Sequence, residues 1–334
     1  MMWTKFVFEV VLLTFFGVLG LIGNISLIRL FLKAEVKLNF HRLMILLAFY
    51  DILLIILFIV VIAMPEVSQD YKSHGYYFLI APKAMPLLQI AMTGSAYCTI
   101  CVSFERYMTV CHPFYMARKR WSAKRYIIPI VLFSIIYNAS RFFEFYTERI
   151  EFGPKEKLGN AFTDDGTESG IYTDQIGITA LRLNKYYVKI YIIGLNFIFN
   201  GFIPFVSIIA LNVLVYVQLK RVINTKNSQI LFSNYQQQQN DKTRQDGSLK
   251  VDEILQAKIN LIVASVFIVC NSIRWIPNTC ELLEVVFQSE LGQDWTLLIT
   301  KIGHLSNCLI VLNSSVNFYI YYFTHHGIPF IHTK

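Results

Sequence analysis

Polar side chains inside long apolar stretches are the residues of this chain best placed to do chemistry. Asn24, Asp51, Ser95, Asn313 and Asn317 each interrupt such a stretch, and together they offer a carboxylate, amides and a hydroxyl. Polar groups are costly in an apolar environment, so each one signals function or a satisfied partner. These oxygens suit a small hard cation such as Na⁺, and hydrogen bonds between helices are the alternative. The pattern predicts a polar hinge, with a bound sodium ion as one interpretation.

A second constellation is Glu105-Arg106-Tyr107, at the inner end of the third apolar stretch. A glutamate beside an arginine at a membrane edge restrains the guanidinium by charge pairing, and loss of that pairing frees it for another partner. The tripeptide is common on protein surfaces and means little in isolation. Its position in the chain makes it a candidate switch.

Two prolines mark candidate pivots. Pro277 follows Trp275 in Arg274-Trp275-Ile276-Pro277, and Pro204 lies in the preceding apolar stretch. Proline removes a backbone hydrogen bond and kinks a helix, which gives the inner half of the helix a pivot. We expect Trp275 to sense packing beside this kink; a passive kink is the alternative.

The elements that must position these residues are seven apolar stretches. A helix needs about 20 apolar residues to cross a bilayer, whereas a barrel strand needs only about 10 and alternates. The sequence therefore predicts an all-α membrane protein, a seven-transmembrane-helix bundle forming one domain over residues 1–334. The expected spans are 6–32, 41–64, 80–110, 126–146, 187–219, 254–286 and 295–323.

Composition agrees with a chain that lies mostly in lipid. Only 16% of the residues are charged and 55% are hydrophobic, whereas soluble domains carry about 25% charged residues. A signal peptide is the alternative for the first stretch, but its apolar core would span only about 7–15 residues. The stretch here continues beyond Leu27, so we expect an uncleaved first helix.

Lysine and arginine in the connecting loops set the expected orientation. With the N-terminus outside, the inner side carries fourteen of them: Lys33, Lys37, Arg42, Arg118, Lys119, Arg120, Lys124, Arg125, Lys220, Arg221, Lys226, Lys242, Arg244 and Lys250. The outer side carries six: Lys72, Arg149, Lys155, Lys157, Arg182 and Lys185. This asymmetry predicts the N-terminus outside and the C-terminus inside.

Three segments leave the expected bundle. The outer loop 147–186 is acidic and interrupted by glycines, and we expect it to be poorly ordered, with short strands at most. The inner loop 220–253 is basic and glutamine-rich, which favours flexibility. The tail 324–334 is short. The six cysteines fall in or beside spans, without the spacing of a disulfide framework or a metal site.

Together these residues resemble the rhodopsin-like G-protein-coupled receptors over nearly the whole chain. The matching segments are Gly23-Asn24, Leu47-Ala48-Phe49-Tyr50-Asp51, Glu105-Arg106-Tyr107, Pro204, Trp275-Ile276-Pro277 and Asn317-Phe318-Tyr319-Ile320-Tyr321. The resemblance implies a multi-pass receptor of the plasma membrane and no covalent chemistry, so no enzyme. It also implies a heterotrimeric G protein as partner, coupled through Glu105, Arg106, Tyr107, Asn317 and Tyr321.

A narrower set of residues is similar to the invertebrate FMRFamide-type neuropeptide receptors and their nematode relatives. These segments are Pro86-Leu87-Leu88-Gln89-Ile90-Ala91-Met92-Thr93-Gly94-Ser95, Cys111-His112-Pro113, Asn271-Ser272-Ile273-Arg274-Trp275-Ile276-Pro277-Asn278 and Leu312-Asn313-Ser314-Ser315-Val316-Asn317-Phe318. The resemblance implies a short extracellular peptide ligand that ends in Arg-Phe-amide and enters between the helices.

The absence of two residues that other receptor groups share narrows the ligand class further. Leu88 stands where amine receptors share an aspartate, and Val311 stands where opsins hold retinal on a lysine. A cationic peptide would instead meet acidic residues in the outer loop and near the outer ends of spans 6 and 7; plain solvation of an outer surface is the alternative. The candidate ligand-pocket residues are Leu88, Gln89, Arg274, Asn278, Glu281 and His304.

Departures from the family pattern keep rival functions open. Ala81 replaces the cysteine of the usual outer disulfide, Phe318 replaces the usual proline of span 7, and Asn212 replaces a tyrosine of span 5. A chemosensory receptor for a small molecule and a truncated, non-signalling form that pairs with a full receptor both stay open, as does a dimer. A transporter would need inverted repeats, and a nucleic-acid-binding protein would need a solvated basic face; we find neither.

Overall fold

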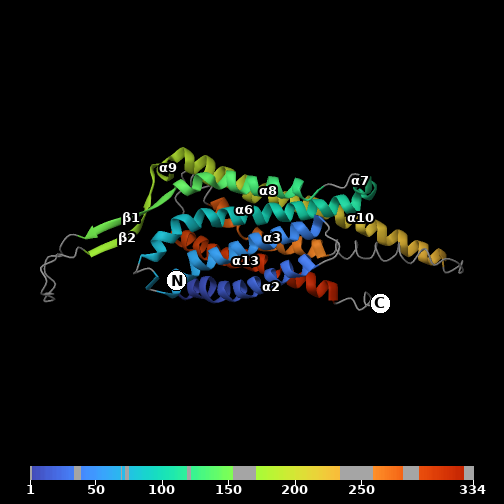
Figure 1. Cartoon of the computed structure of the whole chain (residues 1–334), viewed down its shortest axis with the longest axis horizontal. Helices are drawn as coiled ribbons and strands as arrows, with labels where there is room; N and C mark the ends of the chain where they lie inside the picture. Colours follow the sequence, from blue (N-terminus) through green and yellow to red (C-terminus); the bar gives the residue numbers. More distant parts are fainter. Residues whose placement is uncertain are drawn as a thin grey trace.

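The computed structural model describes residues 2–33, 39–68, 70–71, 75–118, 122–152, 171–233, 259–280 and 293–326. Long helices lie side by side, and a pair of strands projects from the end of the bundle where the chain begins (Figure 1). Among these residues, six helices are long and apolar enough to cross a membrane. The observed architecture is that of a helical membrane protein.

The first three spans follow the sequence closely. The first combines α1 (Met2–Phe6), a π-helical segment η1 (Val7–Leu12) and α2 (Leu13–Lys33), and the second combines α3 (Asn39–Phe58), the π-helical η2 (Ile59–Ala63) and α4 (Met64–Val67). The third is α6 (Tyr76–Cys111), followed by the short α7 (Pro113–Arg118). Proline at the first position of α7 suits a helix start, because its fixed φ is already helical.

The later spans differ from expectation at their ends. The fourth is α8 (Lys124–Asn138) with a 3₁₀ turn η3 (Ala139–Phe143), so it ends before the expected residue 146. The fifth follows the short α9 (Ala180–Leu183) and joins η4 (Tyr187–Leu195) and η5 (Phe197–Phe202), both π-helical, to α10 (Ile203–Ser233). Helix α10 thus occupies the first part of the expected inner loop and reaches beyond the other helices (Figure 1).

The expected sixth span, 254–286, is described only from residue 259 to residue 280. An apolar helix covers Ile259–Ser272, residues 273 and 274 form a turn, and a second helical stretch begins at Trp275. The break precedes Pro277, which has no N–H to donate to the carbonyl of Ile273. That carbonyl instead accepts from the backbone N–H of Ile276 at 3.2 Å. The last span, α13, covers Gln293–His326.

The helices pack most extensively as two pairs, α3 against α6 and α2 against α13. Glycine permits a close approach in the second pair: a Cβ atom at Gly20 would lie 2.7 Å from Ile55 Cδ1 and would overlap the side chain of Ser315. Gly94 of α6 similarly faces the ring of Tyr50. Buried apolar side chains fill the remaining space, in one cluster that includes Phe31, Phe40 and Leu43 and another that includes Leu13, Leu54 and Ile55.

A β-hairpin occupies the described part of the expected outer loop. Strand β1 (Phe145–Phe152) pairs antiparallel with β2 (Ile171–Ile178), with Phe145 opposite Ile178. Aromatic and β-branched residues in β1 favour the extended chain. The Thr147 hydroxyl donates to the Phe78 carbonyl at 2.7 Å, which attaches the hairpin to α6. The short strands that the sequence analysis allowed in this loop are thus present as a hairpin; residues 153–170 lie outside the described part.

Candidate functional site

A buried carboxylate joins three helices at mid-bundle. Asp51 of α3 is fully buried. One of its oxygens accepts a hydrogen bond from the Ser95 hydroxyl of α6 at 2.7 Å, and the other accepts from the Asn317 amide of α13 at 2.8 Å. Three of the five predicted hinge residues are thus in direct contact. Their hydrogen bonds stabilise a charge that would be costly to bury alone.

The other two predicted hinge residues lie nearby in different settings. The Asn24 amide donates to the Gly20 carbonyl at 2.9 Å and to the Ser314 carbonyl at 2.8 Å, so it ties α2 to the backbone of α13. Asn313 lines a cavity together with Ser95 and Ser314. The role of this group as a hinge stays a prediction.

Two further series of hydrogen-bonded polar side chains were not predicted from the sequence. The Asn138 amide of α8 donates to Thr93 Oγ1 at 3.0 Å. The Thr93 hydroxyl in turn donates to Asn200 Oδ1 of η5 at 3.0 Å. Near the inner ends, Asn260 donates to Asn212 Oδ1 at 3.1 Å, and Asn212 donates to Ser103 Oγ at 3.2 Å. Asparagines in apolar stretches were the available signal, but the sequence does not show which of them face each other.

The Glu105-Arg106-Tyr107 segment lies in the last two turns of α6, which ends at Cys111, and its first two side chains are buried. Arg106 Nε and Glu105 Oε2 lie 3.3 Å apart, and their orientation makes no hydrogen bond between them. The guanidinium carbon of Arg106 lies 3.9 Å from the centre of the Phe40 ring, a contact that the sequence analysis did not predict. The Tyr107 hydroxyl and His112 Nε2 are 3.1 Å apart and share a hydrogen bond.

The predicted pivot residues lie between spans 5 and 6. The Trp275 ring packs against Phe197 at 4.9 Å and Phe205 at 5.5 Å between ring centres. Pro204 is buried at the start of α10, directly after the π-helical segment η5. A tryptophan beside a helix break and against the neighbouring span can convert a change in packing into a change in helix direction.

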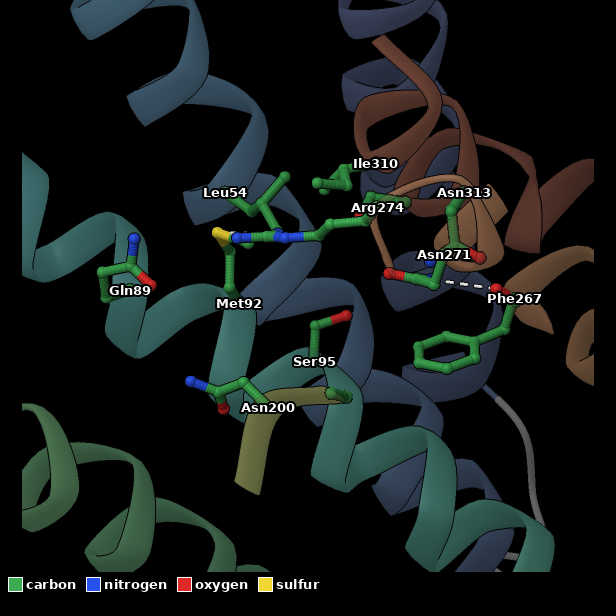
Figure 2. A pocket seen from close by; sticks show the side chains of 12 residues that line it. Leu54, Gln89, Met92, Ser95, Asn200, Phe267, Asn271, Arg274, Ile310 and Asn313 are labelled. Carbon is green, nitrogen blue, oxygen red and sulfur yellow. Dashed lines mark hydrogen bonds between the residues drawn. The ribbon is translucent and has the colours of Figure 1, made fainter. Parts of the chain in front are cut away.

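A cavity opens between the spans next to this pivot. It is small and partly open to solvent, with a cavity volume of about 40 Å³. Figure 2 shows the Arg274 side chain extending across it toward Met92, with Nη1 3.7 Å from the sulfur. Its walls come from spans 2, 3, 5, 6 and 7: Leu54, Gln89, Met92, Ser95, Ala96, Asn200, Phe267, Asn271, Arg274, Ile310, Asn313 and Ser314. A smaller adjoining cavity is lined by Asn278 and Trp275 as well as by Arg274.

The six predicted ligand-pocket residues do not all line one pocket. Gln89, Arg274 and Asn278 line these cavities. Leu88 is buried in the apolar cluster of Leu54 and Ile310, and it is not among the residues that line either cavity. His304 Nδ1 lies 2.7 Å from Glu9 Oε1, so it pairs α13 with η1. Glu281 lies outside the described residues.

The fold is that of a helical membrane protein, and comparison with known families identifies its class. The model of the 7 transmembrane receptor (rhodopsin family) matches residues 23–321. This chain therefore belongs to the rhodopsin family of seven-transmembrane, G-protein-coupled receptors. That resemblance, predicted from the motifs, is confirmed.

Its relatives include receptors for FMRFamide. The chain is 32% identical over 320 residues to the FMRFamide receptor of Drosophila melanogaster, a match that covers 93% of this chain and 50% of that protein. It is 25% identical over 312 residues to the FMRFamide peptide receptor frpr-18 of Caenorhabditis elegans, covering 91% and 63%. It is 23% identical over 335 residues to the probable G-protein coupled receptor frpr-1 of the same nematode, covering 93% and 74%. The chain spans about half the length of the Drosophila relative.

Proposed function

We propose that this receptor lies in the plasma membrane, binds a short extracellular peptide ending in Arg-Phe-amide, and signals through a heterotrimeric G protein. The cavity beside Trp275 carries the proposal, because it brings a polar binding surface against the break in span 6. The names of the fly and nematode relatives support the peptide class. A ligand that binds one arrangement of this region better than the other would shift the receptor toward it.

Seven spans with the N-terminus outside and the C-terminus inside are part of the proposal. The excess of lysine and arginine on one side of the predicted spans supports this orientation. The hairpin β1–β2 lies at the same end of the bundle as the start of the chain (Figure 1). It would then face the outside, beside the mouth through which a peptide enters.

The chemistry of the cavity suits a carboxamide. Its lining combines the Arg274 guanidinium with four side-chain amides, from Gln89, Asn200, Asn271 and Asn313. Amides both donate and accept hydrogen bonds, and guanidinium donates them. A carboxamide at the end of a peptide offers an oxygen to accept and an N–H₂ to donate. The arginine of the peptide carries the same charge as Arg274, so we place it farther out, toward the predicted acidic surface.

Signal transfer would use the residues that connect the cavity to the inner end. Trp275 would sense the ligand, and the break before Pro277 would let the inner helix Ile259–Ser272 pivot. The contacts of Asp51 with Ser95 and Asn317 would rearrange as the helices shift. Arg106 would then leave its buried position and meet the G protein.

The same polar cluster fits a sodium ion. Ser314 is buried, lies close enough to Asp51 to interact with its carboxylate, and lines the cavity next to Ser95. The Asp51 carboxylate has capacity beyond the two hydrogen bonds it accepts. Asp51, Ser95 and Ser314 would hold the ion, which would compensate the charge of the carboxylate.

A small external molecule is the second candidate ligand. The cavity is small, at about 40 Å³, and its lining combines polar side chains with apolar ones such as Leu54, Phe267 and Ile310. A chemosensory receptor would use the same cavity and the same pivot. The peptide receptor and the chemosensory receptor would differ in their ligand and share the same mechanism.

The test is a signalling assay in cells that express the full chain with a surface tag. Calcium and cyclic AMP are measured during challenge with amidated Arg-Phe peptides and with the same peptides as free acids. We expect a submicromolar response to an amidated peptide and a response at least about tenfold weaker to its free acid, because the cavity is matched to a carboxamide. Clear surface staining with no response to any amidated peptide would reject the peptide ligand and favour a small molecule.

A further inference from the structure

The Arg106 guanidinium lies over an aromatic ring that no motif identifies. Its central carbon is 3.9 Å from the centre of the Phe40 ring. The arginine and phenylalanine are only 3% and 1% exposed. A cation over a ring face is attracted by the ring quadrupole, and the attraction grows when water is excluded. The contact joins the inner end of α6 to the start of α3.

The Phe40 ring and the Glu105 carboxylate both contribute to stabilising the Arg106 guanidinium. The carboxylate is close, at 3.3 Å, but the pair lacks the geometry of a hydrogen bond. A buried charge is costly unless its surroundings compensate it. The ring face of Phe40 therefore contributes to holding this side chain within the bundle rather than at its surface.

The Phe40 ring is itself held in place by other rings. It meets Phe31 edge-on at 6.2 Å and His41 at 6.0 Å. Phe31 in turn meets Tyr321 of α13 at 4.9 Å. We call these four residues the inner aromatic cluster. It links α2, α3 and α13, so movement of any of these helices would change the packing around the ring that faces the guanidinium.

Contacts between α6, α10 and span 6 lie along the chain on either side of Arg106. Val215 and Leu219 of α10 pack with Tyr107, Val110 and Leu261. The Ser103–Asn212–Asn260 hydrogen bonds join α6, α10 and the helix Ile259–Ser272. A buried guanidinium in this arrangement is out of reach of a partner on the inner side.

We propose that Phe40 is a positioning residue that holds Arg106 inside the bundle while no ligand is bound. This inference rests on the proposed coupling of Arg106 to a G protein. The ring and the G protein compete for one guanidinium, so the strength of the ring contact sets how often the receptor signals without ligand. Weakening it shifts the population toward the coupling-competent state.

Stepwise fluorination of Phe40 tests the ring electrostatics at nearly constant shape. Phenylalanine with one, two or three ring fluorines is introduced at position 40, and signalling without ligand is measured per receptor at the cell surface. Each fluorine weakens the negative ring face, so we expect a stepwise rise that reaches roughly two- to fivefold. Phe15 is the matched control, since its ring is exposed on α2 and meets Phe16 rather than the inner aromatic cluster; fluorination there should leave the signal unchanged.

A double-mutant cycle tests the contact without any signalling. The unfolding temperature of the purified full chain is measured for Phe40→Leu, Arg106→Met and the double variant. Residues in direct contact couple, so the double variant should lose less than the sum of the two single losses. Additive losses overturn the proposal.

The outcomes separate this inference from the proposed function. A rise with fluorine supports the Phe40 restraint even if every peptide is silent, in which case only the ligand assignment falls. If fluorination of Phe40 leaves ligand-free signalling unchanged in a receptor that responds to a peptide, the Phe40 restraint alone is overturned. A flat series together with silence to every peptide overturns both the restraint and the proposed coupling.

Discussion

At the scale of single residues, the account depends most on the carboxylate of Asp51. It accepts from Ser95 and Asn317, and asparagine would present an N–H₂ to one of these donors. Hydrogen bonds to a charged acceptor contribute about 1.5–3 kcal/mol. We therefore expect Asp51→Asn to lower peptide potency by roughly ten- to a hundredfold with near-normal surface expression. Dose–response curves and surface labelling measure both quantities.

Ser26→Ala is the matched control for this change. The Ser26 hydroxyl lies in the same membrane region but is exposed and donates to its own helix, at the Ile22 carbonyl. Its loss should leave potency within about twofold of the unchanged receptor, since exposed substitutions cost little. Equal potency of the Asp51→Asn variant and the unchanged receptor would contradict the hinge.

Arg274 provides a second residue-scale prediction. Its guanidinium crosses the cavity, and methionine would keep much of its length without the charge. We expect Arg274→Met to reduce the affinity of an amidated peptide at least about tenfold, because a charged hydrogen-bond donor is lost. Competition binding on membranes measures this, and unchanged affinity would place the peptide elsewhere.

The sequence predicted the polar residues of the site better than it predicted their partners. Asp51, Ser95 and Asn317 stood out because polar groups are rare in apolar stretches. Phe40 did not, because one phenylalanine among 27 carries no signal of what it faces. His304 was predicted to line the ligand pocket because the sequence does not show which residue a histidine faces. Only the fold shows that it pairs with Glu9.

At the scale of helices, the close approach of α2 to α13 makes a stability prediction. A methyl group at Gly20 would meet Ile55 at 2.7 Å and overlap Ser315. Overpacking of this kind costs about 1–3 kcal/mol, so Gly20→Ala should lower the unfolding temperature of the purified receptor. Gly303→Ala is the control, because a Cβ atom there meets nothing within 4 Å. Equal unfolding temperatures for the two variants would contradict this packing.

Helix ends and strands were harder to predict than helices. Hydrophobicity specifies where a chain enters lipid, but a helix can continue past its apolar residues, as α10 does to Ser233. The hairpin β1–β2 depends on pairing between segments separated by residues 153–170, and a local pattern does not show such pairing. The break in span 6 was predictable, because Pro277 acts on its own helix.

At the scale of the whole molecule, the orientation in the membrane is the next prediction. An epitope tag inserted in the outer loop, between Gly159 and Asn160, should stain on intact cells. A tag in the inner loop, between Gln238 and Gln239, should stain only after permeabilisation. The excess of basic residues in the inner loops gives this direction. Staining of the inner-loop tag on intact cells would reverse the topology.

In the function proposed here, peptide binding drives nucleotide exchange on a G protein. The most direct measurement uses the purified full chain in lipid nanodiscs with a heterotrimeric G protein, and follows GTP-analogue uptake with an amidated Arg-Phe peptide and with its free acid. We predict that the amidated peptide accelerates uptake and that Asp51→Asn removes most of the acceleration. Specific binding of the peptide without any acceleration of uptake would contradict the account.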